Sequence, residues 1–150
     1  MFSLFFVGLL FCSLSFVWSA TPYKDCGSDL ATIQAFEVTD CTAAPCKLIK
    51  GHTYSMNLTL QAKAPSKTAS VSIHGIIGGI PVPFPIPETD ACKMGIKCPV
   101  AQGDVNVATF SIPVLQSYPS LSLYVKIEVV ADDAKKDFTC LQFPATIVGG

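Results

Sequence analysis

Apolar and polar side chains alternate along several stretches of this chain. In HTYSMNLTLQA, residues 52–62, every second residue from Tyr54 to Leu60 is apolar and the residues between them are polar. SLSLYVKIEVV, residues 120–130, repeats the pattern from Leu121 to Val129. A period of two is typical of a strand with one buried and one solvated face. Four further segments are predicted as strands: residues 29–38, 69–74, 104–112 and 137–147.

Strands with one apolar face must bury that face against another layer. Six of them predict an all-β domain built as a two-sheet sandwich, and a closed barrel is the alternative. The charged stretch DDAKKD, residues 132–137, is expected to form the hairpin turn between the last two strands. No repeat, low-complexity tract or long linker interrupts the pattern, which indicates a single domain.

The segment GIIGGIPVPFPIP, residues 75–87, does not follow the alternation. It has no charged or polar side chain, and it contains four prolines and three glycines. Proline cannot donate a hydrogen bond to a sheet ladder, and it breaks a helix. We therefore expect a stiff, extended loop that makes no ladder hydrogen bonds and presents apolar surface.

The N-terminal end has a different composition. Residues 1–18 are strongly apolar and carry no charged side chain, and small residues follow them. This is typical of a secretory signal peptide, predicted as residues 1–19 with one residue of uncertainty, and it leaves a domain of residues 20–150. An uncleaved membrane anchor is the alternative.

Charge and candidate catalytic groups narrow the function classes. Ten lysines nearly balance eleven acidic residues, and the chain has no arginine, which argues against a nucleic-acid partner. It has two histidines, His52 and His74, and no recognisable catalytic motif. The carboxylate pairs Asp132–Asp133 and Glu88–Asp90 lie in predicted turns, where we expect solvated charge. We therefore predict no enzyme activity, no catalytic residue, no metal and no cofactor.

Six cysteines remain after the predicted leader, which contains Cys12. An even number in a secreted chain indicates three disulfides, for which fifteen pairings are possible. Two pairs close short loops, CTAAPC and CKMGIKC, and pairing within them leaves the outer two for each other. A zinc site is the alternative. The expected bonds are Cys41–Cys46, Cys92–Cys98 and Cys26–Cys140.

Two further side chains carry expectations. Asn57 begins the sequon Asn-Leu-Thr on the polar face of its predicted strand, so we expect N-glycosylation there, with an unoccupied sequon as the alternative. His74 is a candidate for tuning ligand release at acidic pH, but a solvated histidine is the favoured interpretation.

Several motifs together resemble a known family. They are KDCGS at 24–28, the two short cysteine pairs, PVPFPIP at 81–87, Pro113-Val114, YPS at 118–120 and Cys140. In combination they are similar to the Niemann-Pick type C2 branch of sterol carriers in the MD-2-related lipid-recognition (ML) family. The resemblance implies an immunoglobulin-like β-sandwich with a lipid cavity between its sheets and the same three disulfides.

The resemblance also implies a function. It points to a monomeric carrier, secreted or in the lumen of lysosomes and endosomes, that binds cholesterol or a related sterol. The implied carrier contacts membranes transiently and passes its ligand to them or to a Niemann-Pick type C1-like membrane acceptor. By the same resemblance, portal and upper-pocket positions are Phe84, Val114, Tyr118 and Pro119, and deeper tunnel positions are Val38, Leu123, Val125, Ile127 and Leu141. A membrane-contacting knob is implied at His74, Gly75, Ile76, Ile77, Gly78 and Gly79.

Three positions depart from the pattern of the family. Ile127 and Leu141 stand where vertebrate sterol carriers often have tryptophan, and Gly78 stands where methionine is frequent. Relatives with a similar framework also suggest two alternatives. One is a carrier of fatty acids or semiochemicals, and the other is a module that presents lipid in innate immunity.

Overall fold

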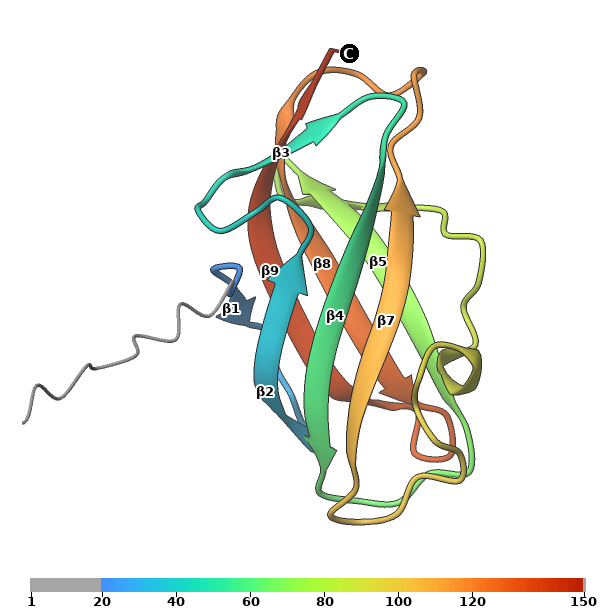
Figure 1. The fold of residues 1–150 in the computed structure, drawn as a ribbon. Helices are drawn as coiled ribbons and strands as arrows, with labels where there is room; N and C mark the ends of the chain where they lie inside the picture. Colours follow the sequence, from blue (N-terminus) through green and yellow to red (C-terminus); the bar gives the residue numbers. More distant parts are fainter. Residues whose placement is uncertain (1–19, 150) are drawn as a thin grey trace, which may run out of the picture.

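The chain folds as two packed β-sheets. The computed structural model describes residues 20–149, and the predicted signal peptide, residues 1–19, lies outside them. Figure 1 shows β2, β4 and β7 as one layer in front of β5, β8 and β9. The elements are β1 (Lys24–Asp25), β2 (Ala31–Val38), β3 (Cys46–Ile49), β4 (Thr53–Ala62), β5 (Ala69–Ile77), β6 (Ile80–Pro83), η1 (Ala91–Lys93), β7 (Val105–Pro113), β8 (Ser122–Ala131) and β9 (Lys136–Val148).

The described strands pair as two separate sheets, which confirms the sandwich and rejects the closed barrel. The larger sheet has the order β1-β9-β8-β5-β6, with β3 also pairing with β9, and the smaller has the order β2-β4-β7. All six predicted strands are present, within a few residues of the expected bounds. The β3 segment, which pairs with β9 in parallel, was not predicted.

The expectation of a loop without ladder bonds at residues 75–87 is wrong in its first half. Gly75 to Ile77 complete β5, and β6 pairs with β5 as an antiparallel edge strand. The Phe84 amide donates to the Ile73 carbonyl. Because backbone N–H groups point to alternate sides along a strand, the Val82 N–H also points toward β5, whereas the backbone nitrogens of Pro81 and Pro83 point away from it. At an outer edge the missing proline N–H donors leave no ladder bond unmade. Outside the two-residue turn between the strands, the part of this segment without strand structure begins after Pro83.

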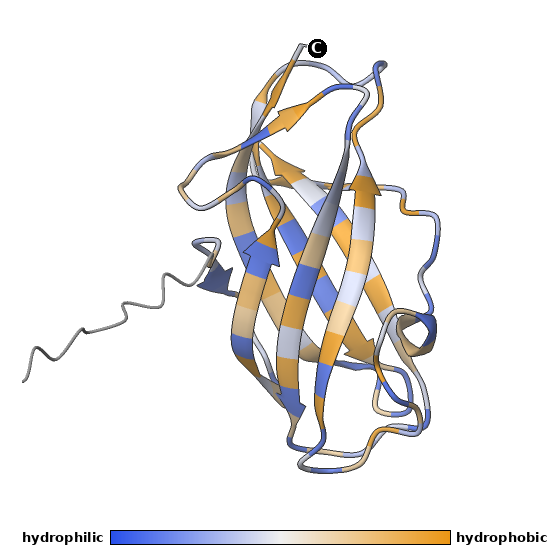
Figure 2. Ribbon diagram, viewed as in Figure 1, coloured by the Kyte–Doolittle hydropathy of each residue, from blue (hydrophilic) through white to orange (hydrophobic). Residues whose placement is uncertain are grey.

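The alternation of the sequence corresponds to the two faces of each strand. Bands of opposite hydropathy follow one another along the strands in Figure 2, and the apolar residues of β4 are buried from Tyr54 to Leu60. Three disulfides join the framework with the predicted pairing, Cys26–Cys140, Cys41–Cys46 and Cys92–Cys98. Among residues 20–149, no helix has the length and apolar character needed to cross a bilayer.

One end of the sandwich is closed by polar contacts around the β8–β9 turn. The Asp132 carboxylate accepts hydrogen bonds from the Thr68 and Ser70 hydroxyls, each at 2.8 Å. Asp133 accepts one from the Lys67 amide at 2.8 Å. Asp133 is exposed and Asp132 is half-buried, in keeping with the expected solvated charge, and both carboxylates in addition connect the turn to residues at or just before the start of β5. We call this region the closed end.

Candidate ligand-binding site

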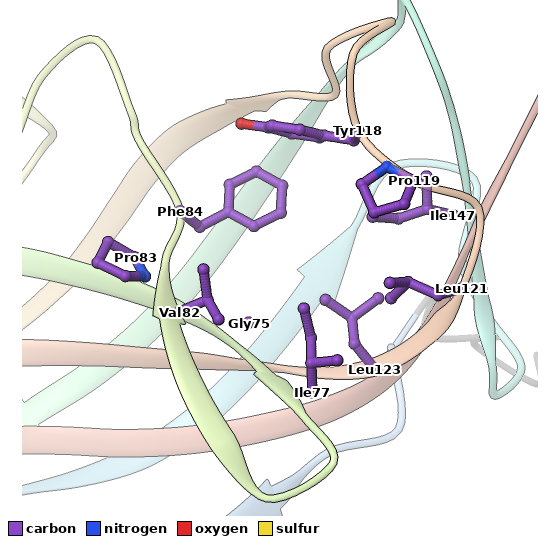
Figure 3. A pocket seen from close by; sticks show the side chains of 10 residues that line it. All are labelled: Gly75, Ile77, Val82, Pro83, Phe84, Tyr118, Pro119, Leu121, Leu123 and Ile147. Carbon is purple, nitrogen blue, oxygen red and sulfur yellow. The ribbon is translucent and has the colours of Figure 1, made fainter.

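An apolar cavity of about 110 Å³ lies at the opposite end of the sandwich. It opens between the β5–β6 hairpin and the connection from β7 to β8, and we call this opening the mouth (Figure 3). The lining residues have almost exclusively apolar side chains: Gly75, Ile77, Val82, Pro83, Phe84, Tyr118, Pro119, Leu121, Leu123 and Ile147. With so little polarity, the walls of the cavity suit a hydrocarbon surface.

Two aromatic rings cover the cavity at the mouth. Phe84 follows the edge strand β6, and Tyr118 lies on the β7–β8 connection, so the rings come from opposite sides of the opening. Their centroids are 5.3 Å apart with an interplanar angle of 70°, an edge-to-face contact. Such a pair contributes about 0.5–1.5 kcal/mol beyond its buried area. A contact of this size can stabilise the covered mouth and is still weak enough for thermal motion to separate the two rings.

The hydroxyl of Tyr118 is in an unfavourable position. Its oxygen is buried, and among residues 20–149 it has no hydrogen-bond partner. Burial raises the pKa of this phenol above its ordinary value of 10.0. Leaving a buried hydroxyl unpaired costs about 1–3 kcal/mol. The arrangement in which Tyr118 covers Phe84 is therefore destabilised by its own polar group, which favours movement of the ring.

The predicted portal residues are brought together by the fold, except for one. Phe84, Tyr118 and Pro119 line the cavity, while Val114 is buried beyond its lining. Leu123 is the one predicted tunnel residue in the cavity wall. The other four are packed in the interior: Val38, Val125, Ile127 and Leu141.

The interior below the cavity is filled by side chains. Ile127 on β8 and Leu141 on β9 are cross-strand partners, and both are completely buried. The two positions that depart from the family pattern are therefore direct neighbours in the larger sheet. Any tunnel that extends to this depth requires the two sheets to move apart.

Residues 74–79, the predicted knob, lie partly on β5 and partly in the exposed turn that follows it. Gly78 and Gly79 are the exposed turn between Ile77 and Ile80, and both have positive φ, 57° and 80°, as a two-residue hairpin turn of this type requires. His74 and Ile76 lie on the outer face of β5, whereas Gly75 is buried on the inner face. His74 does not line the cavity, and its Nδ1 lies 3.4 Å from the Ser72 hydroxyl.

Six other lining residues are not predicted as ligand contacts from the sequence. Two of them, Gly75 and Ile77, are expected in the membrane-contacting knob, and the other four are Val82, Pro83, Leu121 and Ile147. Leu121 was recognised only as an inward position of its strand. Ile147 continues the inward series Phe143 and Ala145 of β9, which was the available signal. Cavity walls and ordinary cores use the same residue types, so periodicity alone could not separate them.

The cavity is small for a lipid. Ligand pockets usually measure about 300–1,000 Å³, so a volume of about 110 Å³ corresponds to a closed form. Entry of a lipid must displace the Phe84–Tyr118 pair and widen the space between the sheets. At the mouth, the exposed edge strand β6 pairs with β5 alone and over only four residue pairs, so its movement would disturb few ladder bonds.

The fold and site together define a disulfide-linked β-sandwich with an apolar interior site at one end. The profile of the ML domain matches residues 20–147, and the chain belongs to the ML domain family. NPC intracellular cholesterol transporter 2 of Bos taurus is 41% identical over 143 residues, which cover 94% of this chain and 95% of that protein.

Solved structures show the same fold. A Niemann-Pick type C2 protein from the Japanese carpenter ant superposes with a TM-score of 0.78 at 24% identity, covering 85% of this chain and 99% of that one. Chicken MD-1 complexed with lipid IVa gives a TM-score of 0.53 at 19% identity, covering 81% and 85% of the two chains.

Proposed function

We propose that this protein is a carrier that binds cholesterol or a closely related sterol between its two sheets and transfers it to membranes or to a membrane-bound acceptor. The single observation that carries the proposal is the apolar cavity with a mouth covered by Phe84 and Tyr118. The relative from Bos taurus, named as a cholesterol transporter and matched along nearly its whole length, supports the choice of ligand.

The energetics suit a carrier that must also release its ligand. Burying about 400 Å² of sterol surface at about 25 cal/mol per Å² gives about 10 kcal/mol. At least about 4 kcal/mol is lost with the translational and rotational freedom of the ligand. The difference of about 6 kcal/mol corresponds to a dissociation constant of some tens of micromolar, and separating the two rings and widening the cavity weaken binding further. Such a modest affinity favours delivery of the sterol after binding.

The framework can tolerate a widened interior because it is covalently joined. Cys26–Cys140 closes a loop of 114 residues and fastens β9 to the segment before β2. A loop of about 100 residues corresponds to about 4.7 kcal/mol in the chain-entropy model. This stabilisation offsets the cost of an interior that is not filled when the ligand leaves.

We place this carrier outside the cell or in the lumen of endosomes and lysosomes. We expect it to act as a monomer and to perform no covalent chemistry. Its proposed acceptor is a Niemann-Pick type C1-like membrane protein. Asn57 is exposed on the outer face of the smaller sheet, so a glycan there would not obstruct the mouth. The exposed turn Gly78–Gly79 beside the mouth is the proposed point of transient membrane contact.

Saturable binding of cholesterol tests the proposal. Delipidated protein is titrated with a fluorescent sterol and then competed with unlabelled cholesterol. We expect saturable binding at one site per chain, and faster sterol loss from Phe84→Ala, because the mouth loses its covering ring. Absence of saturable binding in the wild type contradicts the proposed function.

A fatty-acid carrier is the second candidate, because the narrow cavity of about 110 Å³ accepts a single acyl chain with less widening than a fused-ring body. Competition of cholesterol against oleate separates the two. Displacement of bound sterol only by a large excess of oleate supports the sterol carrier, and the opposite order supports the fatty-acid carrier.

A further inference from the structure

Gly75 occupies an inward-facing position in the middle of the larger sheet. Its cross-strand partners are Val82 on β6 and Val125 on β8, and Val125 in turn pairs with Phe143 on β9. Four cross-strand partners on β6, β5, β8 and β9 therefore follow one another as Val, Gly, Val and Phe, and only the glycine contributes no side chain. Glycine in a strand interior weakens the strand and often marks a place where another group approaches closely.

The backbone does not explain this glycine. Gly78 and Gly79 require positive φ for the hairpin turn, but Gly75 has no positive φ and continues β5 as an ordinary strand residue. Its lack of a side chain must therefore be explained by the space around it.

That space belongs to the cavity. A Cβ placed on Gly75 would lie 2.9 Å from Leu123 Cδ1 and 4.0 Å from Phe84 Cδ2. Gly75, Leu123 and Phe84 all line the cavity, directly behind the aromatic pair at the mouth (Figure 3). The end of the leucine side chain could shift to make room, because it is flexible, but the added methyl group would still take up volume between Leu123 and Phe84, in the part of the cavity next to the aromatic pair.

We propose that Gly75 sets the width of the cavity just behind the mouth and thereby selects a fused-ring sterol over a single acyl chain. The inference rests on the proposed function and identifies a residue that determines its specificity. A ring system is broader than an acyl chain, so one methyl group at this depth obstructs the sterol and leaves room for the chain. One methylene in a hydrophobic pocket changes discrimination by about 10-fold to 200-fold.

The test uses Gly75→Ala with a matched control. Gly149→Ala makes the same chemical change where the new Cβ meets no described atom within 4 Å and the glycine φ is not positive. Cholesterol and oleate are titrated separately into wild type and both variants, and thermal unfolding checks that each variant is folded. We expect Gly75→Ala to bind cholesterol at least about tenfold more weakly while its oleate affinity changes far less. Gly149→Ala should match the wild type for both ligands.

A rescue variant ties the effect to the cavity. Leu123→Ala, combined with Gly75→Ala, removes the side chain that the new methyl group would meet and should restore most of the cholesterol affinity. If Gly75→Ala does not fold, Leu123→Phe replaces it, because it narrows the same place from the neighbouring strand and should give the same loss of cholesterol preference.

The outcomes separate the inference from the proposed function. Equal cholesterol affinity in Gly75→Ala and Gly149→Ala, or equal losses for cholesterol and oleate in Gly75→Ala, overturns the inference while the carrier function stands. A wild-type protein that binds no cholesterol overturns both. Selective loss of cholesterol with recovery in the double variant establishes Gly75 as the residue that sets sterol preference.

Discussion

The mouth and the closed end are built from the same two sheets and differ in the contacts that cover the interior at each end. At the closed end, the Asp132 and Asp133 carboxylates hold the β8–β9 turn, and Phe138 at the start of β9 is completely buried. At the mouth, Ile80 and Leu115 are 66% and 46% exposed, and the rings of Phe84 and Tyr118 cover an incompletely filled interior. One end therefore maintains the fold, and the other can open without unfolding it.

The comparison explains where the unusual composition lies. Glycine and proline in strands normally weaken a sheet. Here they are concentrated in the β5–β6 hairpin, beside the mouth through which the proposed ligand would enter. Substitutions at the two ends should therefore affect different properties, stability at the closed end and ligand binding at the mouth.

The largest expected contrast is between two phenylalanines. Phe138→Ala should lower the free energy of unfolding by about 3–5 kcal/mol, because it leaves a cavity in a packed core. Phe84→Ala should cost less, about 1.5–3 kcal/mol for the lost burial of the ring, because Phe84 borders the cavity on one side. Urea unfolding of both variants measures the difference, and equal losses would contradict the distinction between the two ends.

The next largest effect is expected from the hydrogen bonds of Asp132 at the closed end. Asp132→Ala removes the acceptor of two hydroxyl groups and should destabilise the protein by about 2 kcal/mol, since hydrogen bonds to a charged group are stronger than neutral ones. Its affinity for cholesterol, measured by titration, should remain within experimental error of the wild type. A large loss of affinity would show that the closed end also shapes the site. Asp133→Ala, which removes one amide partner, serves as the milder comparison.

A pH effect should follow from Asp137, also at the start of β9. Burial, assisted by the hydrogen bond and charge of Glu128 and by Asp29, raises its pKa to about 7, while the charge of Lys126 acts in the opposite direction. In the unfolded chain an aspartate titrates near about pH 4. The folded protein therefore holds an extra proton between these values, so stability is greatest at acidic pH and falls as pH rises through about 7.

Asp137→Asn measures that contribution. The variant should match the wild type near pH 4 and exceed its unfolding free energy above pH 7 by on the order of 1 kcal/mol, a value reduced by partial exposure of the carboxyl group. Unfolding experiments at several pH values between these limits give the curve. A constant difference between variant and wild type at every pH would contradict the assignment.

The smallest effect concerns the unpaired hydroxyl at the mouth. Tyr118→Phe removes a buried polar group without a described partner and should stabilise the closed form by a few tenths to about 1 kcal/mol. Sterol entry, followed by stopped-flow fluorescence, should be slower than in the wild type. Unchanged stability and entry rate would show that the hydroxyl has no part in opening.

Much of the fold could be predicted because the alternation in segments such as residues 52–62 and 120–130 is regular. The prolines of residues 81–87 were misleading, since their missing donors exclude a central strand but not an outer edge. The short strand β3 could not be anticipated, because its parallel partner β9 lies about a hundred residues further along the chain and only tertiary packing brings them together.

The site could be predicted only where a motif marked it. PVPFPIP and YPS identified Phe84 and Tyr118, but Ile147 and the inward placement of Gly75 required the structure. Ile127 and Leu141, in contrast, are predicted as tunnel residues but do not line the cavity. They are inward aliphatic residues that fill the core in the closed form. The sequence reports which face a residue belongs to, while the packing of both sheets determines whether that face borders a cavity.

Native mass spectrometry of the protein purified from its source tests the central claim most directly, with the bound molecule extracted and identified. The account predicts one sterol bound per chain, lost more readily from Phe84→Ala when the variant is expressed in the same source. Recovery of the protein with only fatty acid, or with no lipid after mild purification, would contradict a sterol carrier whose mouth is covered by Phe84 and Tyr118.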